Sequence, residues 1–233
     1  MAGGLMPLTA EPGRPLRFRA FEADGYARGF EVVAGVDEVG RGPLAGPVVA
    51  AAVVLPRDFS HGEIKDSKLL SPKQRERLAP LIRERAESWA LGVVEVDEID
   101  RINILQASLL AMVKALDALA RKPDCLLIDG NQAIPARLLH ENGWQALSPP
   151  YQRTIVKGDQ LCLSIAAASI VAKVARDEMM VEFDKQFPEY GFAGHKGYGS
   201  AAHLAALRRH GPSPIHRKSF APVRDAIATT RAG

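Results

Sequence analysis

Four acidic residues follow apolar segments at points where predicted strands end. Asp37 and Glu38 come after VVAGV, Asp129 after CLLI, and Asp159 after RTIVKG. In an open α/β sheet, ligands bind at the carboxyl ends of the strands. Carboxylates without nearby His or Cys ligands suit a hard divalent cation, Mg²⁺ or Mn²⁺. Two such ions about 4 Å apart would clamp an in-line displacement at phosphorus, so this pattern indicates phosphodiester hydrolysis.

Three of these acids also have a purely structural interpretation. Asp129 precedes a glycine and could form an Asx-type turn. Asp159 precedes a predicted helix and could be its N-cap, and Glu38 could lie in solvent at a strand end. Taken singly, none of the three identifies a metal site. The indication comes from their shared position at strand ends.

Asp37 is harder to explain without a ligand. It follows a run predicted to be a central strand, where an unpaired ionised carboxylate costs several kcal/mol, so it needs a cation. Adjacent strand residues point to opposite faces of a sheet. Asp37 and Glu38 can therefore meet at one site only if the strand ends or bends there, and Gly40 and Gly42 permit such a bend.

The elements that must position these acids alternate along the chain. The capping-box sequence SPKQ predicts a helix start at Pro72, and Pro80 should kink or interrupt that helix. The turn GRGPLAG has a length that suits a hairpin between the first two strands. We predict strands at 32–36, 47–55, 91–96, 125–128 and 153–157, and helices at 72–88, at 104–120 and from the residue after Gly158-Asp159 to just before Pro188. This order favours a three-layer α/β domain with a mixed sheet, antiparallel at its start and parallel later.

The end of the chain has a different charge pattern. Residues 191–221 contain no Asp or Glu over 31 positions, but they include Lys196, Arg208, Arg209, Arg217 and Lys218. This pattern indicates a surface for a polyanion such as nucleic acid. The alternative is an ordinary solvated basic face.

The same segment carries four histidines and a tyrosine between two glycines. The histidines, His195, His203, His210 and His216, have no compact metal-ligand spacing, so we predict that they contact phosphate or lie on the surface. Tyr198 could stack on a sugar or base, or it could pack over the edge of the core.

Composition limits the class of protein. The chain has 233 residues, 47% of them hydrophobic, and a formal net charge of +3, which suits a folded globular protein. Its two cysteines, Cys125 and Cys162, lack metal or redox spacing and are expected to be reduced, buried thiols in a cytoplasmic protein. The first thirty residues lack the apolar segment of a signal peptide, and no apolar run is long enough for a membrane span.

The motifs VDEVGRG, DSKLLS, LLIDGN, VKGD, SIAAASIVAKVARD and GFAGHKGY, in this order, closely resemble type 2 ribonuclease H, ribonuclease HII. The resemblance covers about residues 31–223. It leaves 1–30 as an N-terminal extension, flexible up to about Phe30, and 224–233 as a C-terminal tail. It implies a ribonuclease H-like fold with a mixed five-stranded sheet and a helical C-terminal part.

The resemblance also implies an activity. Such enzymes are Mg²⁺- or Mn²⁺-dependent endonucleases that cut the RNA strand of RNA–DNA hybrids. They also cut 5′ of a single ribonucleotide embedded in duplex DNA, leaving 3′-hydroxyl and 5′-phosphate ends, and so serve DNA replication and repair. No obligate protein partner is expected, and a monomer is the default expectation.

The family's site residues map onto matching positions of this sequence. Its four acids correspond to Asp37, Glu38, Asp129 and Asp159, its GRG element to Gly40, Arg41 and Gly42, and its junction-sensing tyrosine to Tyr198. Glycine backbone can approach a ribose closely, and an arginine can fork onto a phosphate. Lys68 and Lys196 are candidates for further phosphate contacts, or else plain surface lysines.

Three other functions fit the sequence less well. A dinucleotide-binding fingerprint must open a helix after a strand, whereas the glycines here lead into VVAAAVVL. In a non-catalytic nucleic-acid-binding module, acids at the strand ends would repel phosphate unless metals neutralised them. A sugar-kinase-like phosphotransferase would need a phosphate loop, and no such motif is recognisable.

Overall fold

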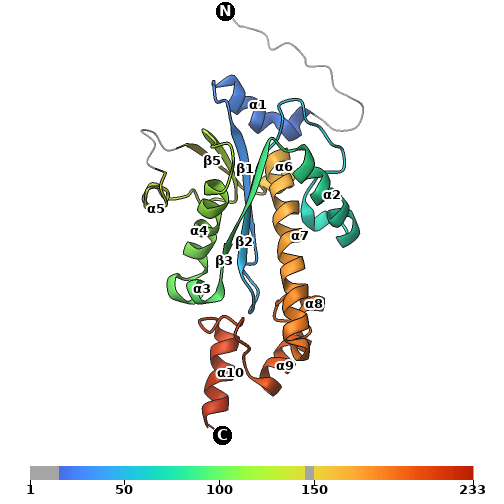
Figure 1. Ribbon diagram of the computed structural model, residues 1–233, viewed down its shortest axis with the longest axis vertical. Helices are drawn as coiled ribbons and strands as arrows, with labels where there is room; N and C mark the ends of the chain where they lie inside the picture. The colour runs from blue at the N-terminus through green and yellow to red at the C-terminus, as the bar shows by residue number, and fades with distance from the viewer. Residues whose placement is uncertain (1–15, 145–149, 233) are drawn as a thin grey trace, which may run out of the picture.

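The computed structural model describes residues 16–144 and 150–232, which are built around one five-stranded sheet (Figure 1). The strands lie in the order β3-β2-β1-β4-β5. The pairs β1–β2 and β2–β3 are antiparallel, whereas β1–β4 and β4–β5 are parallel. The predicted mixed sheet is therefore confirmed. Its strands are β1 (Val33–Val39), β2 (Val48–Val54), β3 (Ser88–Val94), β4 (Cys125–Asp129) and β5 (Tyr151–Ile155).

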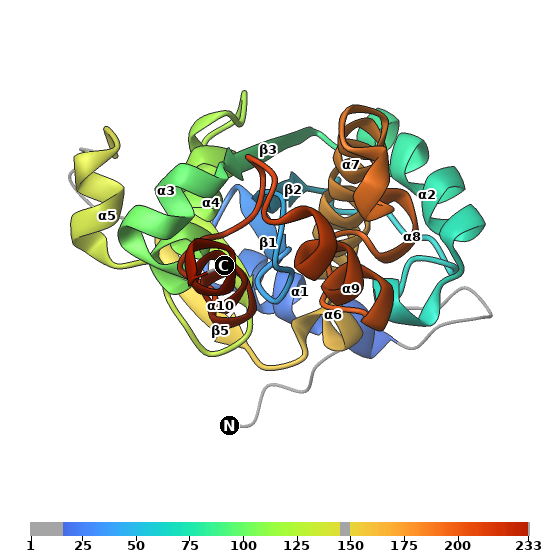
Figure 2. The ribbon, with the colours of Figure 1, turned by 90° about the horizontal axis from the view of Figure 1, so that it is seen from below.

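Helices cover both faces of this sheet (Figure 2). The long helix α7 (Leu163–Gln186) packs on one face, with α2 (Pro72–Arg85) against it. On the other face lies α4 (Ile104–Asp117), accompanied by α3 (Val96–Ile102) and α5 (Ala136–Glu141). The three-layer α/β architecture expected from the order of the elements is thus present.

Short elements connect the layers and complete the C-terminal part. The 3-10 helix η2 (Ser67–Leu69) precedes α2, and the short helix α6 (Gly158–Leu161) joins β5 to α7. After α7 the chain forms short helices joined by loops, with one isolated β-bridge between His216 and Ala45, and it ends below the sheet in Figure 1. This helical part comprises η3 (Pro188–Tyr190), α8 (Phe192–His195), α9 (Ala201–His210) and α10 (Ala221–Ala232).

The core explains why the central strands are uniformly apolar. All seven residues of β2, VVAAAVV, are buried, because helices cover this strand on both faces. The edge strand β3 instead alternates buried and half-buried residues. Two glycines let the layers approach closely, since a Cβ at Gly35 would lie 2.2 Å from the Ser164 backbone and one at Gly92 would lie 1.9 Å from the Ala111 carbonyl oxygen.

The structure corrects three predicted boundaries. The strand predicted at 91–96 begins at Ser88, because 88–94 pair with the whole length of β2. The helix predicted to end at Ser88 therefore stops at Arg85, although Pro80 lies within it. Val96 begins helix α3, which was not predicted and whose first turn carries two acids that favour a helix N-terminus.

The single helix predicted to follow Gly158-Asp159 is two helices, and the first of them already includes these two residues. Cys162 has extended dihedral angles (φ −134°, ψ 124°) and separates α6 from α7. Asp159 therefore lies on a short helix of its own, separate from the long one. This break matters for the site described below.

Residues 16–30 differ from the expected flexible extension. They form η1 (Leu16–Arg19) and α1 (Ala20–Ala27), and the carboxylate of Glu22 is buried. Its Oε1 accepts a hydrogen bond from the Ser164 amide at the start of α7 (2.8 Å). An acid at a helix N-terminus is stabilised by the helix dipole, which fixes α1 to the domain. Residues 1–15 lie outside the described part of the chain.

The C-terminal end is also structured. The boundary expected at 223/224 falls inside α10, and Val223 is buried in a cluster with Leu44 and Leu207. Across the described residues, no helix is long and apolar enough to cross a membrane.

We predict that Gly92→Ala strongly destabilises the fold. The new methyl group would overlap the Ala111 carbonyl of α4, and neither element can move without losing sheet or helix contacts. Overpacking of this kind costs about 1–3 kcal/mol or more in the free energy of unfolding, which urea denaturation measures. Gly62→Ala is the control, since nothing lies within 4 Å of the added Cβ. Equal stability of the two variants would contradict the prediction.

Candidate active site

Asp37 and Asp129 lie side by side because their strands are parallel neighbours. Val36 of β1 pairs with Ile128 of β4, so the next residue of each strand is an aspartate at the same level of the sheet. Asp37 is buried at 7% exposure, and its Oδ1 accepts a hydrogen bond from the Glu38 amide (2.8 Å). The register of one strand pair therefore brings these two acids together.

Glu38 lies on the opposite face of β1, toward α4. It lines a pocket of about 100 Å³ together with Asp129, Arg41 and residues of α4. Its Oε1 is 3.2 Å from the Arg41 guanidinium. Asp129, at the end of the adjacent strand, is within electrostatic range of both Asp37 and Glu38. The strand does not end before Asp37 as predicted, because β1 continues in register with β2 to Val39. Asp37 and Glu38 therefore lie on opposite faces of β1, and each interacts with Asp129 at the end of β4.

Asp159 reaches the same place from α6. The Gly158 amide donates a 2.7 Å hydrogen bond to Asp129 Oδ1, which ties the start of α6 to the end of β4. Asp159 is buried, and its Oδ2 is 3.4 Å from the ammonium of Lys68, an otherwise exposed side chain from η2. The structure therefore brings together all four acids and also one of the two candidate lysines.

Burial raises the pKa values of Asp37, Glu38 and Asp159, and neighbouring acids add to the effect. The pKa of Asp37 is well above its ordinary value, because the carboxyl group is buried and because Glu38 and Asp129 carry the same charge. Burial also raises the pKa of Glu38 and of Asp159, against the opposing influence of Arg41 and Lys68 respectively. Ionised together, these carboxylates repel one another in a poorly solvated place, which favours binding of cations.

The donor atoms fit a hard divalent metal ion. All are carboxylate oxygens, the ligands preferred by Mg²⁺ and Mn²⁺, and Glu38 Oε2 is buried without a hydrogen-bond partner. Within 16–144 and 150–232, no three His, Cys, Asp or Glu side chains are close enough to enclose an ion as they stand. The acids therefore converge on an open site rather than a closed cage.

Two serines near the acids were not singled out from the sequence. The hydroxyl of Ser169 in α7 lies 2.8 Å from that of Ser67 in η2. Ser169 also lowers the pKa of Asp37 and so opposes the effect of burial. Both serines are buried. They belong to the motifs DSKLLS and SIAAASIVAKVARD, which the sequence analysis quoted. The sequence of these motifs does not show which strand each serine lies against.

The prediction of a basic surface at 191–221 is wrong for Arg217. Its guanidinium is fully buried and donates hydrogen bonds to carbonyl oxygens of the GRGPLAG turn. Arg176 of α7, which the sequence analysis did not single out, is equally buried beside that turn. Burial and the neighbouring charge of Arg176 lower the pKa of Arg217 to about 9, so it stays charged at neutral pH.

The prediction that the histidines contact phosphate or lie on the surface is wrong for His203 and His216, which are fully buried. The Ser213 amide donates to His216 Nδ1 (2.9 Å), so His216 carries its proton on Nε2 and donates it to His203 Nε2 (3.0 Å). His203 then donates from Nδ1 to the Tyr198 carbonyl (2.8 Å). Burial lowers both pKa values, that of His216 to about 4, which keeps the pair neutral.

This neutral pair holds the loop that carries Tyr198. The tyrosine is 45% exposed, and its Cε1 would lie 3.6 Å from a Cβ placed on Gly42. Leu44 donates a backbone hydrogen bond to Gly197 (2.8 Å), which joins the two loops. The structure therefore brings Tyr198 next to the GRG element, with its ring available to a ligand.

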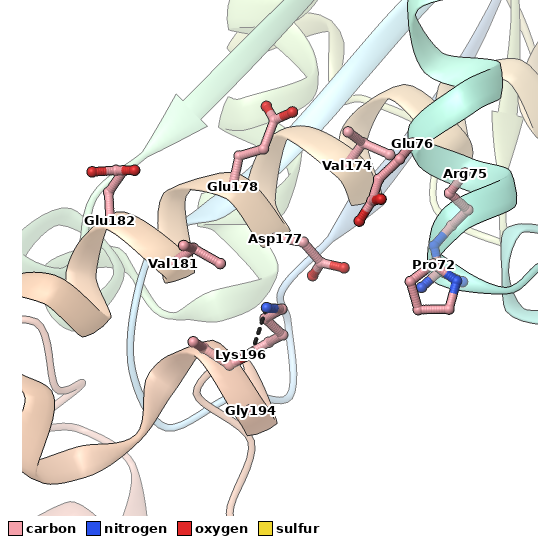
Figure 3. A pocket seen from close by; sticks show the side chains of 11 residues that line it. Pro72, Arg75, Glu76, Val174, Asp177, Glu178, Val181, Glu182, Gly194 and Lys196 are labelled. Carbon is pink, nitrogen blue, oxygen red and sulfur yellow. Dashed lines mark hydrogen bonds between the residues drawn. The ribbon is translucent and has the colours of Figure 1, made fainter.

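Lys196 lies in different surroundings (Figure 3). Its ammonium donates to the Ala193 carbonyl (2.6 Å) in a pocket of about 370 Å³ between α2, α7 and α8. The lining includes the carboxylates of Glu76, Asp177, Glu178 and Glu182. Because these acids would repel a phosphate, a phosphate contact by Lys196 stays a prediction with little structural support.

Comparisons with known proteins identify the family of this chain. The family model described as Ribonuclease HII matches residues 34–223. This chain belongs to the ribonuclease HII family. It is 52% identical over 207 residues to a ribonuclease HII of Syntrophotalea carbinolica, covering 89% of this chain and 93% of that protein.

Two solved structures show the same fold. The ribonuclease H2 of Pyrococcus horikoshii OT3 matches with a TM-score of 0.71 and 28% identity, covering 87% of this chain and all of that one. A Bst-RNase HIII in complex with Mn²⁺ matches with a TM-score of 0.65 and 23% identity over 87% of this chain and 71% of that one, a likeness of fold alone. Ribonucleases HII are divalent-metal-dependent endonucleases that cleave the RNA strand of RNA–DNA hybrids.

We predict that Asp37→Asn stabilises this ribonuclease HII in metal-free buffer at neutral pH. A raised carboxyl pKa means that the ionised form destabilises the fold, by about 1.4 kcal/mol for every tenfold change in the acid dissociation constant. This destabilisation is present above the folded-state pKa and is lost as the pH falls through it. The melting temperature in EDTA should therefore exceed that of the wild type at pH 7, and the difference should shrink in acid.

Divalent metal should reverse this order. Mg²⁺ or Mn²⁺ should raise the melting temperature of the wild type and have much less effect on Asp37→Asn, because a ligand that binds only the folded state stabilises it. Asp58→Asn, at an exposed aspartate remote from the strand ends, is the control and should follow the wild type. A variant that melts below the wild type in EDTA would contradict the electrostatic interpretation.

Proposed function

We propose that this ribonuclease HII cuts 5′ of a single ribonucleotide embedded in duplex DNA, in addition to cutting the RNA strand of hybrids, and leaves 3′-hydroxyl and 5′-phosphate ends. The observation that carries the proposal is the position of the GRG element. Gly40, Arg41 and Gly42 directly follow β1, which carries Asp37 and Glu38 just before its last residue, Val39, and Tyr198 lies against Gly42. Groups able to contact a ribose are thus placed beside groups able to bind metal.

Asp37, Glu38, Asp129 and Asp159 are the residues that would hold the metal ions. When bound, a pair of Mg²⁺ or Mn²⁺ ions supplies an activated water and stabilises the leaving oxygen of the phosphodiester. The Glu38 amide fixes the orientation of Asp37, and the Gly158 amide that of Asp129. The chain's own contribution is therefore to keep four carboxylates converged in a place from which most water is excluded.

The remaining residues would position the substrate. Arg41 is exposed beside Glu38 and can place its planar guanidinium on a phosphate next to the cleaved bond. Lys68, 3.4 Å from Asp159, is placed to contact a phosphate near the metals, and Lys196 is the weaker candidate. The exposed ring of Tyr198 would stack on the sugar or base beside the ribonucleotide.

The proposal also covers the oligomeric state of the protein and the compartment in which it acts. We expect a monomer that acts in the cytoplasm on ribonucleotides and RNA primers left in DNA, within one catalytic domain over about 31–223. Both cysteines are free and buried thiols, which suits a reducing compartment.

Cleavage of a labelled DNA duplex with one ribonucleotide tests this proposal. With Mg²⁺ or Mn²⁺ the wild type should give a single nick on the 5′ side of the ribonucleotide, whereas Asp37→Asn should lose at least about 100-fold in rate and still bind the duplex. Fragment mapping on a sequencing gel identifies the cut bond. Cleavage of hybrids alone, or full activity of Asp37→Asn, would refute the proposal.

A second test concerns Tyr198. We predict that Tyr198→Ala reduces cleavage at a single ribonucleotide about tenfold or more, since stacking on one base is worth about 1–3 kcal/mol. Cleavage of an RNA–DNA hybrid and the melting temperature should change much less. Tyr198→Phe keeps the ring and is the matched control. Equal losses on both substrates would show that the ring does not recognise the junction.

A further inference from the structure

Arg217 makes an unusual set of contacts for a buried cation. Its Nη1 donates to the Arg41 carbonyl (3.1 Å), its Nη2 to the Gly40 carbonyl (2.6 Å), and both Nε and Nη2 donate to the Gly46 carbonyl (3.0 and 2.8 Å). No acidic side chain forms an ion pair with it in the described part of the chain. All of the hydrogen bonds described for its side chain therefore orient backbone of the GRGPLAG turn.

The geometry of the peptide group determines the direction of the amides that follow these carbonyls. A trans peptide is planar, so its C=O and N–H bonds point in opposite directions, and no described peptide is cis. The carbonyls of Gly40 and Arg41 point inward to Arg217. The amides that follow them in the chain, those of Arg41 and Gly42, must therefore point outward.

Those two amides are free to bind a ligand. Both residues are exposed, and neither amide donates to any described residue, whereas the amides of Leu44 and Gly46 in the same turn are bonded to Gly197 and Ile215. Gly42 also lies against the Tyr198 ring. Two unsatisfied donors thus point from the end of β1 toward the place proposed for the ribose.

We infer that Arg217 is the positioning residue for recognition of the 2′-hydroxyl: by holding the Gly40 and Arg41 carbonyls it aims the Arg41 and Gly42 amides at the 2′-oxygen of the substrate. This inference rests on the proposed function and deepens it. The 2′-hydroxyl can accept hydrogen bonds from these amides, whereas a deoxyribose offers no atom there. The arginine acts through the backbone and does not touch the substrate itself.

Arg176 offers a comparison within the same protein. It is as buried as Arg217 and also donates only to carbonyls, those of Pro47, Ala45 and Lys196. None of these belongs to the peptides between Gly40 and Gly42. Arg176 packs against the Gly40 backbone but donates no hydrogen bond to the Gly40 or Arg41 carbonyl. It is therefore a control for the loss of a buried guanidinium beside the turn that does not hold these two carbonyls.

The experiment measures binding in EDTA, where the substrate is not cut. Fluorescence anisotropy gives the affinity for a DNA duplex with one ribonucleotide and for the all-DNA duplex of the same sequence. We expect the wild type to prefer the ribonucleotide duplex, and Arg217→Lys to lower that preference about tenfold or more while affinity for all-DNA duplex stays within about twofold. Arg176→Lys should keep the preference.

The outcomes separate the inference from the proposed function. A wild type that shows no preference but still nicks the ribonucleotide duplex with Mg²⁺ would overturn the inference alone, whereas a wild type that neither prefers nor nicks that duplex would refute the proposed function. A wild-type preference that Arg217→Lys retains, or that both variants lose equally, would overturn the inference alone, because Arg217 would then be a general support of the fold.

A measurement on the unaltered protein covers the case in which Arg217→Lys does not fold. The Arg41 and Gly42 amides should exchange hydrogen rapidly in the free protein, and they should be protected by the ribonucleotide duplex but not by the all-DNA duplex. Amide exchange followed by NMR resolves these two signals. Equal protection by both duplexes would show that the amides do not recognise the 2′-oxygen.

Discussion

The mutual repulsion of buried carboxylates at one end of the sheet is the constraint on which the site depends. Among the described residues, no lysine or arginine forms an ion pair with Asp37. The Glu38 and Gly158 amides, which are neutral groups, orient Asp37 and Asp129. Glu38 and Asp159 are paired with the exposed cations Arg41 and Lys68, so much of the negative charge of the site is available to metal ions.

The two buried arginines follow from the same constraint. Arg176 and Arg217 lie close to the strand that carries Asp37, and an ion pair with an acid would be the usual way to bury them. Their N–H groups instead donate to backbone carbonyl oxygens, so both guanidinium groups are hydrogen-bonded without forming ion pairs with the carboxylates. The histidine pair His203–His216 is also neutral, so it adds no positive charge that would offset the carboxylates.

The sequence allowed the sheet, its mixed direction and the convergence of the four acids to be predicted, because strand ends are marked by a change from apolar to acidic residues. It did not allow the burial of Arg217 or His216 to be predicted, since a basic segment without acids has the same composition whether its charges face phosphate or backbone carbonyls. The break at Cys162 was missed for a similar reason, because α6 and α7 together have one helical pattern and only tertiary packing separates them. Local composition predicts which residues can do chemistry, and packing decides which of them face the substrate.

Breaking the ion pairs of the exposed cations costs less free energy than breaking the hydrogen bonds of the buried arginine. Arg41 beside Glu38 and Lys68 beside Asp159 have exposed side chains, so their ion pairs contribute about 0–1 kcal/mol each to stability. The acids can exchange these partners for metal ions, and the cations can turn to phosphate, with little loss. Arg217 cannot be released in this way, because three carbonyl oxygens would lose their donors in the protein interior. Exchangeable charges therefore lie where substrate and metal arrive, and fixed charges lie where the backbone must not move.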